Sequence, residues 1–198
     1  MKSLILGLVA AVSLVPAAQA AIIHNEAIDG DLSSNNLAPT VLEVNRGSNQ
    51  IIGSVTPNPN IDRDFFTITI ADNQLLTAII LENYDTTEDQ SFFAVELGTQ
   101  ISSIISAATF LGTANIGLPA VAPEGSDVLD NLGQALLGGS GFSGPLGPGT
   151  YTFWFQETVA PVAYTFNLQV ASTPEPSSLL GAGVVLGLSA LLKKKKSA

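Results

Sequence analysis

The sequence predicts an all-β protein: an antiparallel β-sandwich of the jelly-roll type, with one short helix in a long loop. Three observations lead to this fold class. Apolar and polar residues alternate in short runs, which is typical of half-buried strands. Turn-forming residues separate these runs, as expected for a sandwich. The segment 21–173 is long enough to bury a core, and the chain has no cysteine, so that core must stabilise the fold without disulfides.

Seven or eight strands are expected along the chain. Residues 41–44 and 51–55 are two short apolar candidates. Residues 66–70 alternate phenylalanine and isoleucine with threonine. Residues 75–81 are almost continuously apolar, which predicts a central strand buried on both faces. The later strands are expected to bury three sets of side chains: Phe93, Val95 and Leu97; Tyr151, Phe153 and Phe155; and Tyr164, Phe166, Leu168 and Val170.

Glycine and proline mark the connections. Residues 45–49 and 57–60 have the composition of tight turns. Residues 112–149 hold ten glycines and four prolines in 38 residues, so we expect a long connection there. Within it, Ser126 is a good N-cap and four leucines form a stripe, which predicts one short helix over residues 127–137 packed on the sandwich.

The predicted domain is strongly acidic. It holds sixteen of the seventeen Asp and Glu residues but only two basic residues, Arg46 and Arg63, so its formal net charge is −14. Such a surface repels nucleic-acid phosphates and anionic lipids and attracts cations, so we expect no nucleic-acid partner. The lack of cysteine excludes thiol nucleophiles and cysteine-based zinc or iron–sulfur sites.

The first 20 residues have the layout of a secretory signal peptide. Lys2 supplies the positive start and residues 4–15 supply the apolar centre. Ala18 and Ala20 form the small-x-small site at which signal peptidase is expected to cut. The exported domain then covers residues 21–173.

The last 25 residues predict a membrane segment whose end is cytoplasmic. Pro174, Glu175 and Pro176 precede an apolar stretch over residues 179–192 and four lysines at 193–196. Basic flanks resist translocation, so the lysines are expected on the cytoplasmic side. The apolar stretch of 14 residues is roughly 21 Å long as a helix, which is short for a hydrocarbon core about 30 Å thick. An ordinary C-terminal membrane anchor is the alternative interpretation.

This order of parts resembles the PEP-CTERM sorting signal of bacterial surface proteins. The resemblance rests on Pro174-Glu175-Pro176, the short membrane segment and the basic tail, and covers about an eighth of the chain. It implies that a membrane-embedded exosortase cuts near the motif, after residues 179–192 have held the chain transiently in the membrane. The upstream domain is then expected in the cell envelope or the extracellular space.

The exported segment resembles the bacterial pre-peptidase C-terminal domain family over about residues 26–171. The matching residues are 47–54, 62–68, 149–156 and 164–166, and their order carries the resemblance. The family implies a β-sandwich that serves as an accessory module, often attached to a secreted peptidase, and is not itself a catalyst.

Carboxylates are the candidate site chemistry. Asp29 and Asp31 lie before the first expected strand, and Asp62 and Asp64 lie in the turn before the strand at residues 66–70. Hard oxygen ligands from two loops suit Ca²⁺. The family resemblance adds that some similar domains bind calcium at the corresponding loop and turn. The competing interpretation is that close acidic pairs arise by chance in so acidic a domain, with Asp64 capping a turn.

Trp154 and His24 are the remaining candidates. Trp154 is out of phase with Tyr151, Phe153 and Phe155, so it is expected to point away from the core. An exposed Trp154 would stack on a sugar ring or on a partner's apolar surface; alternatively, the glycine-rich connection covers it. His24 lies four residues into the mature chain, where a packed catalytic triad is not expected.

Together these features predict a non-catalytic exported protein of the cell envelope or extracellular matrix. It would be an exosortase substrate with a binding or structural role beside exopolysaccharide, a partner implied by the PEP-CTERM resemblance. The alternative is an accessory module acting in trans on a secreted peptidase. A hydrolase built on acidic pairs is a third class; glycosidase carboxylates lie about 5–10 Å apart across a cleft, and no cleft follows from the sequence.

Overall fold

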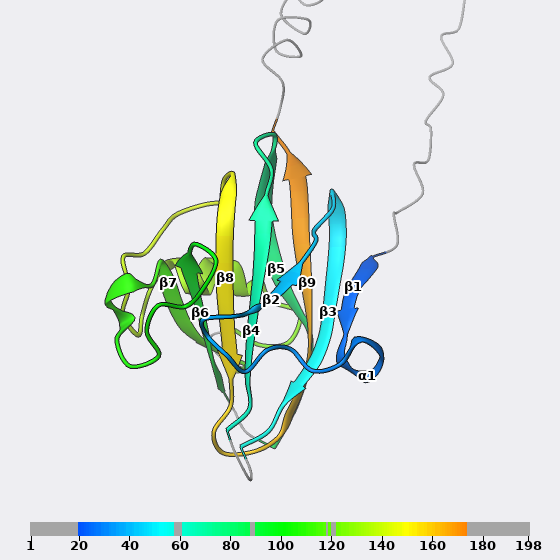
Figure 1. Ribbon diagram of the computed structural model, residues 1–198, viewed down its shortest axis with the longest axis vertical. Helices are drawn as coiled ribbons and strands as arrows, with labels where there is room; N and C mark the ends of the chain where they lie inside the picture. Colours follow the sequence, from blue (N-terminus) through cyan, green and yellow to red (C-terminus); the bar gives the residue numbers. More distant parts are fainter. Residues whose placement is uncertain (1–19, 58–60, 88–89, 118, 120–121, 174–198) are drawn as a thin grey trace, which may run out of the picture.

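Two β-sheets pack face to face, so the predicted all-β sandwich is confirmed (Figure 1). The computed structural model describes residues 20–57, 61–87, 90–117, 119 and 122–173. The predicted sorting motif and membrane segment, and all of the predicted signal peptide but Ala20, lie outside the described residues. Within the described part of the chain, no helix has the length and apolar character needed to cross a membrane.

The first sheet has four strands in the order β1-β3-β9-β5. Their bounds are Ala21–Asn25 for β1, Gly47–Val55 for β3, Val162–Ser172 for β9 and Gln74–Asp85 for β5. β9 pairs antiparallel with both β3 and β5, whereas β1 runs parallel to β3. A short helix, α1 (Glu26–Asp29), follows β1 directly.

The second sheet has five strands in the order β2-β4-β8-β6-β7. Their bounds are Thr40–Leu42 for β2, Arg63–Ile70 for β4, Gly149–Gln156 for β8, Ser91–Leu97 for β6 and Gly112–Ile116 for β7. β2 runs parallel to β4, and the other pairs are antiparallel. Both sheets are therefore mixed, and the prediction of a purely antiparallel sandwich is wrong at β1 and β2. Alternation in a sequence indicates a strand but does not show its direction.

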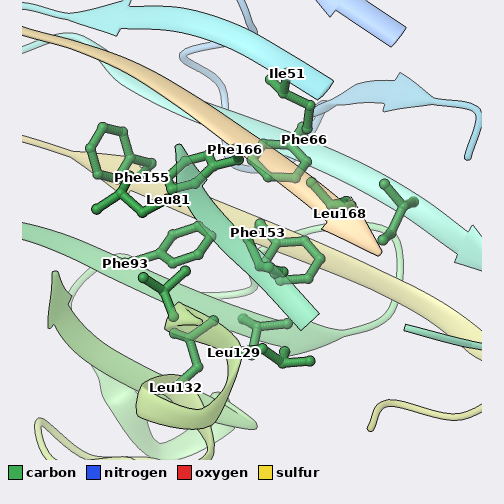
Figure 2. Packing of buried hydrophobic residues seen from close by; sticks show 14 of the residues in the cluster. Ile51, Phe66, Leu81, Phe93, Leu129, Leu132, Phe153, Phe155, Phe166 and Leu168 are labelled. Atoms are coloured by element: carbon green, nitrogen blue, oxygen red, sulfur yellow. The ribbon is translucent and has the colours of Figure 1, made fainter. Parts of the chain in front are cut away.

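Aromatic side chains fill the space between the sheets (Figure 2). Phe166 of β9 stacks on Phe93 of β6 with ring centroids 4.8 Å apart and meets Phe155 of β8 edge-on at 5.3 Å. Phe66 and Phe153 stack at 5.1 Å. All five side chains are fully buried. The inward faces predicted from alternation in β4, β8 and β9 are thus confirmed.

The apolar run at residues 75–81 forms part of β5, which is an edge strand and not a central one. The pairing of β5 with β9 shifts register between Leu76 and Ala78 and again between Leu81 and Asn83. Each irregularity changes which residues face inward, so the run shows no simple alternation. Leu76, Ile79 and Leu81 are fully buried, whereas Leu75, Ala78 and Ile80 are only partly buried, so the run is not buried on both faces.

The free edge of β5 is closed by the long connection between β7 and β8. Leu76 and Leu146 exchange two backbone hydrogen bonds, of 2.9 and 3.0 Å. Further along the edge, Asp127 Oδ1 accepts a hydrogen bond of 3.0 Å from the backbone nitrogen of Ile79. The strand therefore has backbone partners on both sides.

The predicted helix over residues 127–137 is present but shorter, as α2 (Val128–Gly133). Its N-cap is Asp127 and not the predicted Ser126, because Asp127 Oδ1 accepts a 3.0 Å hydrogen bond from Leu129 N. A single carboxylate oxygen thus both caps α2 and binds the edge of β5.

Three leucines expected in the core lie at the surface. Leu97, the last residue of β6, is 64% exposed. Leu136 and Leu137 follow α2 and are also exposed. Ala135 adopts φ = 49°, which takes the chain out of the helical conformation just before these two leucines.

Candidate functional site

Four carboxylates gather where β1 leads into α1 and where β4 begins. One oxygen each of Glu26, Asp31 and Asp64 can be chosen so that all three lie within 4.8 Å of one another. Asp62 adjoins them: burial, and next the charge of Asp31, raise the pKa of Asp62, and Ser34 Oγ donates a 3.1 Å hydrogen bond to Asp62 Oδ1. These four acids are referred to below as the carboxylate cluster.

The predicted pair Asp29 and Asp31 is split by α1. Asp29 Oδ2 accepts a 2.8 Å hydrogen bond from Asn25 N, and Asn25 Oδ1 accepts one of 3.1 Å from Ala27 N. These two hydrogen bonds are local to residues 25–29, and the Asp29 side chain stays exposed at the surface. Gly30, with φ = 90°, then redirects the chain so that Asp31 reaches the cluster. The structure thus brings together Asp31, Asp62 and Asp64 but not Asp29.

Glu26 takes the position that was predicted for Asp29. Its Oε2 accepts a 2.7 Å hydrogen bond from Ser54 N of β3, and its Oε1 accepts one of 3.2 Å from Leu32 N. Sequence reasoning missed Glu26, because the order of acids in this segment does not show which one a short helix turns inward. The available signal was Asn25, an N-cap residue immediately before Glu26, which sets where the helix starts.

Asp64 is the most deeply buried member of the carboxylate cluster, with no exposed surface. Tyr164 donates a 2.6 Å hydrogen bond to its Oδ2, whereas its Oδ1 has no hydrogen-bond partner among the residues that the structure describes. Burial, and next the nearby charge of Glu26, raise the pKa of Asp64 to about 9. A buried polar oxygen without a partner is uncommon in folded proteins and calls for a physical explanation.

Burial is also the first cause of the raised pKa values of Glu26 and Asp62, and the charge of Asp31 adds to both. Arg63 does not neutralise the group, although it stands between Asp62 and Asp64 in the sequence. Alternation along β4 turns Arg63 to the other face of the sheet, where its Nε donates a 3.0 Å hydrogen bond to Gln156 Oε1.

Gly53 makes the close approach of Tyr164 possible. The two residues are register partners in β3 and β9. A Cβ atom on Gly53 would lie 2.5 Å from the Tyr164 hydroxyl oxygen and 3.1 Å from Cδ of Glu26. The lack of a side chain at this position therefore leaves the space in which both side chains reach the carboxylate cluster.

The chemistry of the carboxylate cluster fits a hard divalent cation. Ca²⁺ takes six to eight oxygen ligands in flexible geometry, and the four acids offer carboxylate oxygens only. Asp64 Oδ1, buried and unpartnered beside Glu26 and Asp31, is an oxygen that such an ion would satisfy. The same ion would also offset the burial and, after it, the mutual repulsion that raise the pKa values of Glu26, Asp62 and Asp64.

Trp154 lies on the outer face of the second sheet, as predicted, but it is only 5% exposed. A small apolar cluster covers it, formed with Phe65, Ala94, Ile101 and Phe110. The prediction of an exposed, sugar-stacking Trp154 is therefore wrong. Ile101 and Phe110, which cover Trp154, belong to the connection between β6 and β7. The glycine-rich segment 112–149, which was the alternative prediction for covering Trp154, contributes none of its described residues to this cluster. Alternation shows the face of a strand but not whether a loop folds over it.

His24 is part of β1 and is buried, with 6% of its surface exposed. It therefore lies in a packed position and not in the N-terminal tail that was expected. Its Nε2 has no hydrogen-bond partner within the described part of the chain.

Comparison with protein families, with curated proteins and with solved structures finds no match to this chain. The resemblances to the PEP-CTERM signal and to the pre-peptidase C-terminal domain therefore stay predictions.

Proposed function

We propose that residues 21–173 form a calcium-stabilised, non-catalytic module that is exported and acts in the cell envelope or extracellular matrix, in a binding or structural role beside exopolysaccharide. One observation carries the calcium part of this proposal: the buried, unpartnered oxygen of Asp64 within a group of four acids. A cation held by Glu26, Asp31, Asp62 and Asp64 would supply the missing partner.

Calcium agrees with an exported location. Extracellular calcium-binding modules have dissociation constants of about 10⁻⁴ to 10⁻³ M, which suits a site of a few carboxylates at the protein surface. A chain without cysteine also has no disulfides to stabilise it outside the cell, so a bound ion would take over part of that role.

Export and sorting rest on the two ends of the chain. A leader of the signal-peptide type at residues 1–20 and the Pro174-Glu175-Pro176 motif before an apolar segment and lysines support processing by signal peptidase and exosortase. Mass spectrometry of the protein recovered from the cell surface tests this directly. We expect a chain that starts near Ala21 and ends near the motif; an intact chain in the cytosol would overturn it.

The connectivity supports the finer, jelly-roll description of the sandwich. The order β3-β9-β5 in one sheet and β4-β8-β6-β7 in the other agrees with the strand order expected of a jelly roll. An eighth strand would lie beside β5, where the long connection makes isolated bridges at Leu146 and Asp127 instead. Jelly rolls include many lectin domains, and this fold-level analogy agrees with a binding role.

A melting experiment tests the calcium proposal. Adding millimolar Ca²⁺ to chelator-treated protein should raise the melting temperature by several degrees, because a ligand of the native state stabilises it by mass action. Asp31→Asn should abolish most of the rise. Asp29→Asn is the matched control, since Asp29 lies next to the cluster but outside it, and should keep the wild-type response. Equal melting temperatures in calcium and in chelator would overturn the proposal.

A further inference from the structure

Four side chains form a straight row across the outer face of the second sheet. Gln156 of β8 is the register partner of both Arg63 of β4 and Phe92 of β6, and Phe92 is in turn opposite Asn115 of β7. Residues directly opposite each other in a sheet point to the same face. The row is outward-facing because Phe155, the neighbour of Gln156, points into the core.

The β6–β7 connection covers the neighbouring row, which contains Trp154, and leaves this row partly exposed. Ile101 and Phe110 lie over Trp154. The connection is held in place by Ser102, whose Oγ donates a 2.6 Å hydrogen bond to Glu96 Oε1, and by Asn36, whose Nδ2 donates one of 2.6 Å to the carbonyl of Ile101. The connection only borders the row of Arg63, Gln156, Phe92 and Asn115, referred to below as the amide row, whose four side chains stay partly exposed.

Two hollows lie along the amide row and share a wall. One, of about 210 Å³, is lined by Gln90, Phe92, Asn115 and Gln156 together with the start of the β8–β9 turn. The other, of about 220 Å³, is lined by Phe92 and Gln156 and by the β6–β7 connection, including the 95% exposed Ile105. Each is smaller than the roughly 300–1,000 Å³ typical of pockets for drug-sized ligands. Two small hollows in series suit successive units of a chain better than one compact molecule.

The polar side chains of the amide row are already oriented. Asn115 Nδ2 donates a 2.8 Å hydrogen bond to Gln90 Oε1, and Arg63 Nε donates one of 3.0 Å to Gln156 Oε1. Each of these amides keeps a second polar atom with no hydrogen-bond partner among the described residues, namely Gln156 Nε2, Asn115 Oδ1 and Gln90 Nε2. The surface therefore offers both donors and acceptors, fixed in advance by neighbouring contacts.

We propose that the amide row binds a neutral polysaccharide chain. Sugar hydroxyls both donate and accept hydrogen bonds, as side-chain amides do, and the Phe92 ring offers an apolar surface to a sugar face. Trp154, on the same face of the sheet, contacts that ring edge-on, with centroids 4.8 Å apart. The domain charge of −14 repels an anionic polymer. Arg63, the one basic residue of the amide row, already donates a hydrogen bond to Gln156.

This inference rests on the proposed function, because it names the surface through which the module would contact exopolysaccharide. It differs from the calcium part, since the amide row contains none of the four acids.

Affinity electrophoresis of the full chain, purified in mild detergent, tests the inference. The probes are dextran, a soluble β-1,3-glucan, the anionic polymer alginate, and the exopolysaccharide fraction of the cells that make the protein, each with calcium and with chelator. We expect at least one neutral polymer or the exopolysaccharide fraction to retard the protein, and alginate not to do so. Gln156→Leu and Phe92→Leu should each weaken this retardation about tenfold, with little change in melting temperature.

Gln50→Leu is the matched control. Gln50 is also an outward-facing amide on a strand, but it lies on the first sheet, where its Nε2 donates to Glu82 Oε2 at 2.6 Å. Its replacement should leave binding unchanged. Retardation that survives Gln156→Leu and Phe92→Leu would overturn the amide row but leave a polysaccharide-binding function intact. If no probe retards the protein, both the amide row as a binding site and the polysaccharide-binding function are overturned. Retardation by alginate alone would overturn the proposal that the ligand is a neutral polymer.

Discussion

The Tyr164 hydroxyl donates a 2.6 Å hydrogen bond to Asp64 Oδ2 across the interior of the sandwich. Tyr164 belongs to β9 in the first sheet and Asp64 to β4 in the second, and both are fully buried or nearly so. Burial and the charge of Asp64 raise the pKa of Tyr164, so the hydroxyl keeps its proton and remains the donor. This bond is a polar link between two sheets whose core is largely apolar, and it leads directly into the carboxylate cluster.

The stability of the calcium-free protein should fall as pH rises. The pKa of Asp64 is raised to about 9 in the folded state by burial and then by Glu26, whereas an unfolded Asp titrates near about 4. Between these values the folded protein binds more protons at this site than the unfolded chain does, so its free energy of unfolding decreases with rising pH. In chelator, the urea midpoint should therefore decline from about pH 5 towards pH 9.

Asp64→Asn should flatten this profile and raise the midpoint at the alkaline end, because the amide carries no charge and still accepts from Tyr164. The same variant should lose the melting-temperature rise in calcium. Asp29→Asn is expected to keep the wild-type slope. A slope unchanged by Asp64→Asn would show that this carboxyl does not control the pH dependence.

Tyr164→Phe should destabilise the protein by about 1–3 kcal/mol, because it leaves Asp64 buried without its donor. Chemical denaturation at neutral pH in chelator measures this difference. Tyr151→Phe is a suitable comparison, since Tyr151 donates a 3.0 Å hydrogen bond to the backbone oxygen of Gly147 in a connection. We expect a smaller loss there, and equal losses in the two variants would argue against a special role for the link between the sheets.

Gly53→Ala should destabilise the fold by about 1–3 kcal/mol through overpacking. The new Cβ would lie 2.5 Å from the Tyr164 hydroxyl oxygen, so the ring or β3 must move, and the response to calcium should weaken with it. Gly147→Ala provides the control, because a Cβ at Gly147 meets no atom within 4 Å. Denaturation midpoints and calcium-induced shifts measured on both variants check the prediction; a normal calcium response in Gly53→Ala would contradict it.

Val95→Ala and Leu97→Ala form a matched pair on β6. Val95 is fully buried between the sheets, so its truncation should cost about 2 kcal/mol, whereas Leu97 is 64% exposed and should cost less than about 0.5 kcal/mol. Urea unfolding of the two variants distinguishes the observed arrangement from the sequence-based expectation that both side chains are buried. A larger loss for Leu97→Ala would contradict the structure.

Alternation of apolar and polar residues predicted β4, β6, β8 and β9, because these strands bury one face of regular pleats. The apolar run at residues 51–55 predicted only the second part of β3, which begins at Gly47, so the turn expected over residues 45–49 is wrong from Gly47 on. Alternation did not predict β7, whose sequence Gly112–Ile116 is short and begins in a glycine-rich region. In β5 the register shift between Leu76 and Ala78 interrupts the alternation of the apolar run. The pattern therefore reports local pleating, while strand order and edge position depend on long-range pairing that no short window contains.

The site was predicted in part for a similar reason. Asp62 lies just before β4, as expected, whereas Asp64 is a fully buried residue of β4 and not part of the preceding turn. The choice between Glu26 and Asp29 depends on the exact start and end of a four-residue helix, set by Asn25 and Gly30. The capping residues determine which acid faces the cluster, and sequence patterns locate helix ends only to within a few residues.

The closed edge of β5 determines how copies of this protein behave when crowded together. A bare edge of a twelve-residue strand rich in leucine and isoleucine would present free amides and carbonyls to a neighbouring molecule, the usual beginning of fibrous aggregation. Here Leu146 occupies the backbone groups of Leu76, and Ser126 and Gly125 occupy those of Leu81. Molecules packed densely on one surface would thus remain separate folded units and would not fuse sheet to sheet along this strand.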